Sequence, residues 1–114
     1  MTRIYKILSR AEWAAALATG RVGGSAVDLA DGFIHFSTAE QAEETARRHF
    51  AGETDLWLLS VRSERLGPAL RWEPSRGGAL FPHLYGPLEC ALVEFARPIE
   101  PGADGAPRLG TLEP

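Results

Sequence analysis

Two short β-rich runs, each leading directly into a helix-start signature, restrict the fold of this chain more than any other feature. Residues 4–8 (Ile-Tyr-Lys-Ile-Leu) are followed by Ser9-Arg10-Ala11-Glu12, a capping box. In a capping box the hydroxyl accepts a backbone N–H at the start of the helix, and the glutamate reaches back to the cap residue. Residues 32–37 (Gly-Phe-Ile-His-Phe-Ser) lead in the same way into Ser37-Thr38-Ala39-Glu40. The first half of the chain is therefore predicted to alternate strand and helix.

The second half of the chain reads as strands without a further helix. Residues 56–61 are the most strand-like run and are apolar enough for a central strand. Residues 70–73, 81–86 and 89–95 are the other extended candidates, while residues 22–31, with two glycines at 23–24 and one at 32, read as a loop. About two helices and five or six strands, mixed first and then all β, predict an α+β fold.

The size of the chain fits one domain. Its 114 residues, 45% of them hydrophobic and 24% charged, are typical of a globular domain with a single core. We predict that this domain spans residues 1–100. Six of the last fourteen residues are Gly or Pro, so residues 101–114 are predicted to be a C-terminal tail. With few apolar residues to offset the ordering of its backbone, the tail is expected to be removable with little loss of stability.

The charge and the cysteine content exclude several classes of protein. A net charge of −3 lacks the basic excess that nucleic-acid binding draws on, so a DNA or RNA partner is not expected. No apolar run is long enough to span a membrane, and residues 1–8 do not resemble a signal peptide. Cys90 is the single cysteine and cannot form an internal disulfide. We expect a cytoplasmic protein, and the sequence does not predict its oligomeric state.

His35 is the first candidate for a functional side chain. Alternation along the predicted strand places Ile34 and Phe36 on the core face and Phe33, His35 and Ser37 on the other. Ser37 and Thr38 stand where this strand meets a helix N-terminus, whose free N–H groups suit an anionic group such as a phosphate. The alternatives are that His35 bonds a neighbouring carbonyl and that Ser37 only caps the helix.

A second group of candidates lies further along the chain. Residues 81–86 carry His83 and Tyr85 on one side of a segment shaped by two prolines and a glycine. Arg71 and Glu73 share a face by alternation, which fits either a surface ion pair or a carboxylate that contacts a ribose hydroxyl. Lys6 interrupts an apolar strand, where a cation needs a partner or a ligand.

Standard motifs for cofactors and metals are absent from the sequence. It contains no GxGxxG, no GKS/T, no HExxH and no CxxC. A metal site built from His35, His83 and a glutamate would lack any local ligand spacing. We therefore predict no metal site and no tightly bound cofactor.

Three segments resemble a known family. Residues 4–7, 31–37 and 81–88 (Phe-Pro-His-Leu-Tyr-Gly-Pro-Leu) are similar to the signature segments of DUF952, a family of small, mostly bacterial proteins of unknown function. The resemblance covers about residues 3–100. It implies a compact ADP-ribosyltransferase-like fold, in which two small packed β-sheets enclose a nicotinamide-nucleotide cleft.

A second resemblance concerns one segment and points to the same fold. Residues 34–37, followed by a helix that ends in Arg47-Arg48-His49, are similar to the His-x-Ser and Arg-His segments of the NAD-using RNA 2′-phosphotransferases. Carried over, His35 and Ser37 would contact the nucleotide, and Arg48 is a weaker counterpart. The first strand has Tyr5-Lys6 where that fold usually has His or Arg, and the competing candidates for the catalytic glutamate are Glu73, Glu89 and Glu94.

These resemblances lead to a functional hypothesis with two alternatives. The chain is expected to bind NAD or another ADP-ribose-type nucleotide, with NAD as a substrate and with ADP-ribosyl or phosphoribosyl transfer as the activity. The expected catalytic residues are His35, His83 and Glu73, and the expected ligand-binding residues are Lys6, Ser37, Thr38, Arg71 and Tyr85. One alternative is a non-catalytic nucleotide- or metabolite-binding module without the catalytic glutamate. The other is an interaction protein with a patch of Trp72, Phe81 and Tyr85.

Overall fold

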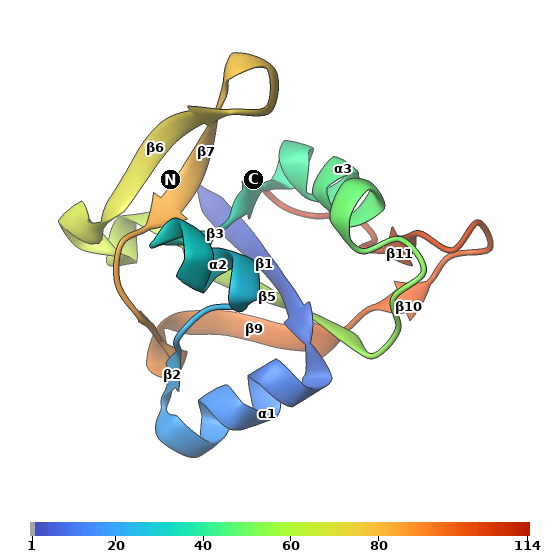
Figure 1. Ribbon diagram of the computed structural model, residues 1–114, viewed down its shortest axis with the longest axis horizontal. Coiled ribbons are helices and arrows are strands. Elements are labelled where there is room, and N and C mark those ends of the chain that lie inside the picture. The colour runs from blue at the N-terminus through green and yellow to red at the C-terminus, as the bar shows by residue number, and fades with distance from the viewer. Residues whose placement is uncertain (1) are drawn as a thin grey trace.

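The computed structural model describes residues 2–114 and is built on a four-stranded antiparallel sheet (Figure 1). Its strand order is β4-β1-β5-β9, with β1 at Arg3–Ser9, β4 at Ser37–Thr38, β5 at Leu56–Arg62 and β9 at Val93–Pro98. The pairing of β1 with β5 runs from Arg3 opposite Arg62 to Ser9 opposite Leu56. Apolar side chains alternate onto both faces of these two strands, so both faces must be covered.

One face is covered by helix α1 (Arg10–Thr19) and by a short ladder of β2 (Arg21–Val22) with β8 (Leu88–Glu89). The predicted capping box is confirmed, since the Ser9 hydroxyl accepts from Glu12 N–H at 3.0 Å and Glu12 accepts from Ser9 N–H at 2.8 Å. Gly20 ends the helix with φ at 85°, a conformation that favours glycine. Trp13 and Ala16 of this helix join the core with Ile4, Leu8, Leu59 and Val61.

The other face is covered by helix α3 (Ala39–His49) and by the C-terminal segment. Ala42 and Ala46 are buried against Tyr5, Ile7 and Leu58. The hairpin of β10 (Glu100–Pro101) and β11 (Pro107–Arg108) leads to Leu109, which is buried in the same cluster.

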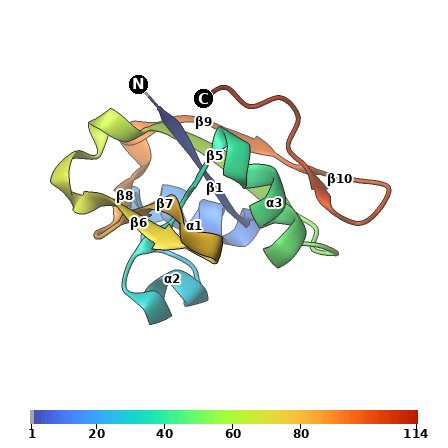
Figure 2. The ribbon, with the colours of Figure 1, turned by 90° about the horizontal axis from the view of Figure 1, so that it is seen from above.

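A second, three-stranded antiparallel sheet lies beside the first and has the order β3-β7-β6. Its strands are β3 (Ile34–His35), β6 (Leu70–Ser75) and β7 (Ala79–Leu84), and the β6–β7 hairpin extends from the body of the molecule (Figure 1). Helix α2 (Ala26–Asp31) precedes β3 and also projects from the body (Figure 2). Single 3₁₀ turns occupy Ser63–Arg65, Gly67–Ala69, Arg76–Gly78 and Cys90–Leu92.

The α+β class is confirmed, with three corrections to the predicted elements. Residues 26–31 form a helix instead of a loop, because Ser25 and Asp28 make a capping box of their own. The strand predicted at 89–95 is interrupted by the 3₁₀ turn that contains Cys90, so the segment contributes to β8 and to β9 separately. The strand predicted at 33–37 is split into β3 and β4, which belong to different sheets.

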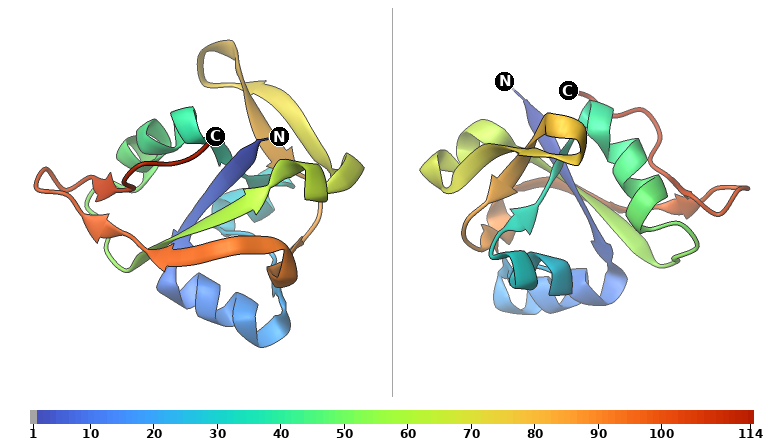
Figure 3. Two further views of the ribbon diagram at one scale, coloured as in Figure 1. Left: turned by 180° about the vertical axis from the view of Figure 1, so that it is seen from behind. Right: turned by 45° about the horizontal axis from the view of Figure 1, so that its top comes forward.

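The C-terminal segment differs from the expected loose tail. Leu109 is 4% exposed, Arg97 Nη2 donates to the Leu109 carbonyl at 2.5 Å, and Tyr5 Oη donates to the Glu113 carbonyl at 2.5 Å. Arg3 also pairs with Glu113, and the two ends of the chain lie close together (Figure 3). The segment from Leu109 to Glu113 thus packs on the sheet.

Candidate functional site

The pairing of β3, β7 and β6 places three predicted site residues in one row. His35 stands opposite His83, and His83 stands opposite Arg71. Side chains at paired positions lie on the same face of a sheet, and Glu73, two residues after Arg71, shares that face. The opposite face carries Ile34 and Leu84, which belong to the core. The fold thus separates a polar row from an apolar row across the same three strands.

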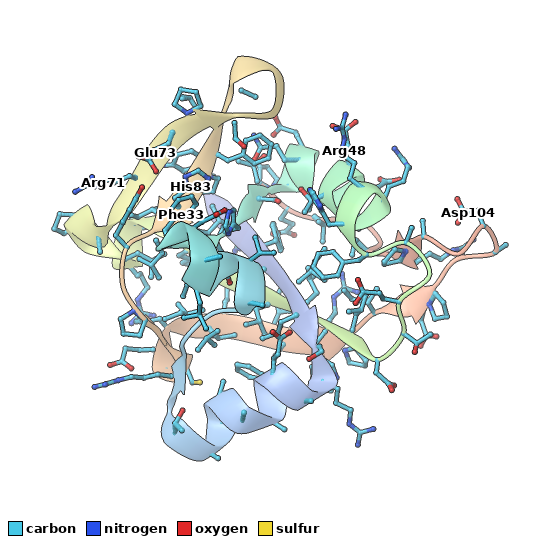
Figure 4. All side chains as sticks on the ribbon, in the orientation of Figure 1. Phe33, Arg48, Arg71, Glu73, His83 and Asp104 are labelled. Carbon is cyan, nitrogen blue, oxygen red and sulfur yellow. The ribbon has the colours of Figure 1, made fainter. Side chains whose placement is uncertain are left out.

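Four rings gather over this row, and two of them, Phe33 and His83, are labelled in Figure 4. The Phe33 ring stacks on His83 with centroids 4.1 Å apart, and its distances to the rings of His35 and Tyr85 are 4.6 Å and 5.2 Å. The imidazoles of His35 and His83 lie 5.5 Å apart, edge to face. The expected convergence of these two histidines, 48 positions apart in sequence, is therefore present.

Glu73 connects His83 with Tyr85. Its Oε1 atom lies 2.8 Å from His83 Nδ1 and accepts from Tyr85 Oη at 2.7 Å. These two hydrogen bonds hold the pKa of Glu73 below its usual value, and the bond to the ionised carboxylate raises the pKa of the Tyr85 hydroxyl. The guanidinium of Arg71 lies over the Tyr85 ring at 4.7 Å. This half of the site is an ionised carboxylate held between an imidazole and a phenol.

Asp28 holds the second histidine. Its Oδ1 atom lies 2.6 Å from His35 Nδ1 and accepts from His35 N–H at 3.1 Å, and its Oδ2 atom accepts from Lys6 Nζ at 2.7 Å. Burial would raise the pKa of Asp28, but the bond from His35 and the charge and bond of Lys6 outweigh burial and hold the pKa well below its usual range. Asp28 is only 2% exposed, so it is a buried carboxylate shared by two basic groups.

The imidazoles of His35 and His83 have the same kind of partner at Nδ1 and different surroundings at Nε2. Each presents Nδ1 to a carboxylate, an arrangement that orients the ring and selects which nitrogen carries the proton. Nε2 of His35 faces the exposed Asp31 carboxylate at 2.9 Å. Nε2 of His83 has no hydrogen-bonding partner among residues 2–114, and the ring lies against Phe33. His35 is thus the more accessible of the two bases.

Ser37 and Thr38 do not join this cluster. Between His35 and Ser37 the chain passes from the three-stranded sheet to the four-stranded sheet, with Phe36 N–H donating to the Pro82 carbonyl at 3.0 Å. Ser37 is therefore placed opposite Tyr5 on the α3 side, where its hydroxyl bonds the Thr45 hydroxyl at 2.8 Å.

The helix cap is also shifted by one residue from the predicted position. Thr38, and not Ser37, caps α3 with its hydroxyl, and Gln41 completes the capping box. The structure therefore gives no contact that joins these two hydroxyls to His35 in one phosphate subsite, because alternation does not continue across a change of sheet.

The remaining predicted residues differ in whether they contact the histidine cluster. Of the three competing glutamates, Glu73 alone contacts a histidine of the cluster, while Glu89 pairs with Arg21 and Glu94 with Arg3 and Arg62. Lys6 lies behind His35 and reaches it only through Asp28. Arg48 lies on α3, away from the cluster (Figure 4).

The predicted interaction patch of Trp72, Phe81 and Tyr85 is not formed. Trp72 pairs with Pro82 and therefore lies on the opposite face from Phe81, which pairs with Glu73 and is buried.

Two residues of the cluster were missed by the sequence analysis. Asp28 had a signal, since Ser25-x-x-Asp28 is a capping-box pattern with aspartate in place of glutamate. Phe33 was placed on the face of His35 but was given no role. Within the part of the chain that the structure describes, no group of three or more His, Cys, Asp or Glu residues is arranged to hold a metal ion.

The comparison with protein families decides the family of this chain. Residues 7–96 match the model of a family described as a protein of unknown function, DUF952. This chain belongs to the DUF952 family. The match runs from the end of β1 through most of β9 and includes Asp28 and all the clustered rings, whereas Lys6 lies one position before it.

Solved structures similar to this DUF952 domain come from Caulobacter crescentus. The crystal structure of its protein CC0527 is 60% identical, covers 95% of both chains and superposes with a TM-score of 0.93. The solution structure of the same protein is 61% identical, covers 96% of this chain and 95% of that one, and has a TM-score of 0.87. No curated protein matches the chain. Neither the family description nor the names of these structures state an activity.

Proposed function

We propose that this DUF952 domain binds NAD or another ADP-ribose-type nucleotide at the cluster of His35, His83, Glu73, Arg71 and Tyr85. The observation that supports this proposal is the convergence of two carboxylate-bound imidazoles with two aromatic rings on one sheet face. The sequence resemblance to the ADP-ribosyltransferase fold provides the ligand class.

The chemical groups of the cluster correspond to the parts of such a ligand. The half-exposed ring of Tyr85, with Arg71 over it, offers a face for a planar base and a cation for a phosphate. Outward-facing His35 would offer Nε2 to a ribose hydroxyl or a phosphate oxygen that takes the place of the exposed Asp31 carboxylate. Glu73 is ionised and stands beside both Tyr85 and His83, where a carboxylate would stabilise positive charge that develops on a ribose.

Turnover requires that the nicotinamide–ribose bond break and that an acceptor take the ribose. A second candidate function, binding without turnover, is favoured by one observation. The Glu73 Oε1 atom is already engaged by the Tyr85 hydroxyl and by His83 Nδ1. Only Oε2 is left to contact a ribose, so Glu73 is less available as a catalytic carboxylate. A nicotinamide-release assay separates the two functions, because a binding module releases none.

Calorimetric titration with NAD, NADH and ADP-ribose tests the proposal, with His35→Ala as the test variant. We expect the substitution to weaken binding by roughly 10- to 150-fold, the range for losing a hydrogen bond to a charged group. The matched control is His49→Ala, which removes an exposed histidine at the end of α3. Absence of heat with all three nucleotides, or equal affinity of the His35 and His49 variants, would contradict the proposal.

A further inference from the structure

Lys6 is the only lysine in the chain, and it is buried. The other eleven basic residues are arginines, whereas the Lys6 side chain is 7% exposed in the middle of β1. Lysine is among the residues that are hardest to bury, because its ammonium loses its hydration. A buried ammonium therefore requires hydrogen-bond acceptors inside the fold.

The ammonium of Lys6 has more donors than the fold uses. Of its three N–H groups, one is donated to Asp28 Oδ2 at 2.7 Å. No second acceptor for Lys6 is present among the residues that the structure describes. Two charged donors in a nearly solvent-free position are thus available for a ligand.

Lys6 is one of the residues that line a cavity of about 280 Å³. It lies between β1, helix α1 and the segment 21–25, and its walls include the apolar side chains of Leu8, Ala15, Ala16 and Val22. The other polar side chains that line it already have partners. Thr19 donates to backbone carbonyls, Glu12 caps α1, and Arg21 pairs with Glu89. Ser25, which also lines the cavity, accepts from Asp28 N–H and caps α2. Lys6 is therefore the buried charged group of the lining that keeps unused N–H donors.

We propose that this cavity is a second binding site, separate from the histidine cluster, for a small monocarboxylic acid with a short aliphatic chain. A carboxylate accepts hydrogen bonds only and has two oxygens, one for each remaining N–H of Lys6. The aliphatic chain would contact the alanine, leucine and valine walls. At about 30 Å³ for each water-sized group, the cavity holds roughly nine such groups, which suits an acid of four to six carbons.

A monoanion fits the charges better than a phosphate dianion. Among the residues that line the cavity, Lys6 and Arg21 are positive and Glu12 is negative. Each of the two cations is already paired with one carboxylate, Lys6 with Asp28 and Arg21 with Glu89, so the surroundings hold no excess of positive charge and oppose a doubly charged ligand more than a singly charged one. The proposal does not depend on the proposed nucleotide function, because neither His35 nor His83 lines this cavity.

Binding at Lys6 is expected to be detectable at His35. Both groups bond the same carboxylate, Lys6 through Oδ2 and His35 through Oδ1 of Asp28. A carboxylate that draws the ammonium toward the cavity would change the environment of that shared aspartate. His35 would then report on a ligand that it does not touch.

The experiment is an NMR titration of the ¹⁵N-labelled full chain with butyrate. The single lysine gives a single side-chain ammonium signal, which we expect to shift saturably together with the imidazole signals of His35. Butyramide, which has the same shape without the charge, is expected to bind at least about tenfold more weakly. Lys6→Met is expected to lower the butyrate affinity by a similar factor.

A pair of alanine variants keeps the test decisive if Lys6→Met does not fold. Ala14 and Ala15 are both exposed on α1, but only Ala15 lines the cavity. Ala15→Leu should fill the cavity and abolish butyrate binding, while Ala14→Leu should bind as the natural chain does. The proposal is overturned if butyrate does not shift the ammonium signal, if butyramide binds as tightly, or if both leucine variants bind butyrate equally.

Discussion

A single buried carboxylate, Asp28, joins three elements of this domain at one point. Its two oxygens receive Lys6 from β1, His35 from β3 and the N–H of Ser25 at the start of α2. Its pKa is held low by these partners, so it stays ionised over the whole neutral range. Removing its charge would leave the Lys6 ammonium buried without a counter-ion.

Asp28→Asn is therefore expected to be strongly destabilising. Breaking one side of a buried ion pair costs about 3–5 kcal/mol, because the remaining charge is desolvated and unpaired. The matched control is Asp31→Asn, which removes the exposed carboxylate on the other side of His35 and should cost less than about 1 kcal/mol. Urea unfolding of both variants measures the difference. Equal stabilities would show that Asp28 does not balance the charge of Lys6.

At the scale of single elements, the start of α2 depends on a close approach of backbone to side chain. Gly24 has φ at 114°, and a Cβ atom there would stand 2.7 Å from Asp28 Cβ. The preceding Gly23 has open space around the position of a Cβ atom and no left-handed φ. The two neighbouring glycines thus have different reasons to be glycine.

This contrast makes a testable pair. Gly24→Ala is expected to cost about 1–3 kcal/mol, because the new methyl group is strained at a left-handed φ and pushes Asp28 out of place. Gly23→Ala is expected to be neutral or slightly stabilising. Thermal or urea unfolding of both variants checks the prediction, and a Gly24 variant as stable as the Gly23 variant would contradict it.

Glu94 of β9 forms hydrogen bonds with two other strands of its sheet, and these bonds are expected to make the stability of the fold depend on pH in the acid range. Glu94 accepts from Arg3 of β1 at 2.8 Å and from Arg62 and Ser60 of β5 at 2.9 Å and 3.1 Å. The bond from Arg3 is the largest cause that lowers the pKa of Glu94, from 4.5 to about 2. A carboxyl with a lowered pKa in the folded state stabilises the fold above pH 4.5 and loses that contribution as the pH falls toward 2.

The variant Glu94→Gln is expected to lack this pH-dependent contribution to the free energy of unfolding. Its free energy of unfolding should lie below that of the natural chain at pH 6, and the gap should narrow as the pH falls from 4.5 toward 2. Urea unfolding at several pH values measures the gap. A gap that is constant over this range would show that the charge of Glu94 does not stabilise the sheet.

Elements whose signals are local could be predicted from the sequence, and elements set by distant pairing could not. The first strand and its capping box at Ser9 and Glu12 were predicted because all their determinants lie within nine residues. The strand at 33–37 was predicted as one element, but Ile34 pairs with Leu84 and Ser37 with Tyr5. No local feature of residues 33–37 indicates that the partners of Ile34 and Ser37 belong to two different sheets.

At the scale of the whole molecule, the same difference between local signals and distant contacts explains which residues of the site could be predicted. His35, His83 and Glu73 were identified from their polarity among apolar neighbours, and the resemblance placed both histidines at one cleft. The link from Lys6 through Asp28 to His35 joins residues 22 and 7 positions apart across three elements, and no periodicity connects them. Their contact follows only from the tertiary packing that brings α2 and β3 beside β1.

At the scale of the whole molecule, the contacts of the last fourteen residues lead us to expect that they stabilise the fold, although their composition alone predicts a removable tail. The face of the sheet that carries Tyr5 and Leu58 is closed by α3 on one side and by Leu109, with Leu112 beside it, on the other. A chain ending at Glu100 would expose this apolar surface and would leave the carbonyl partners of Tyr5 and Arg97 missing. Burial of one leucine contributes about 1.5–3 kcal/mol, and each hydrogen bond adds to this amount.

We therefore expect the truncated chain to lose about 2–4 kcal/mol and to melt about 10 °C or more below the full chain. Leu109→Ala in the full chain serves as the comparison, since it keeps the backbone contacts and removes only the buried side chain. If packing of the segment is what matters, the point variant should reproduce about half or more of the truncation's effect. A truncated chain that melts at the temperature of the full chain would show instead that α3 alone closes this face.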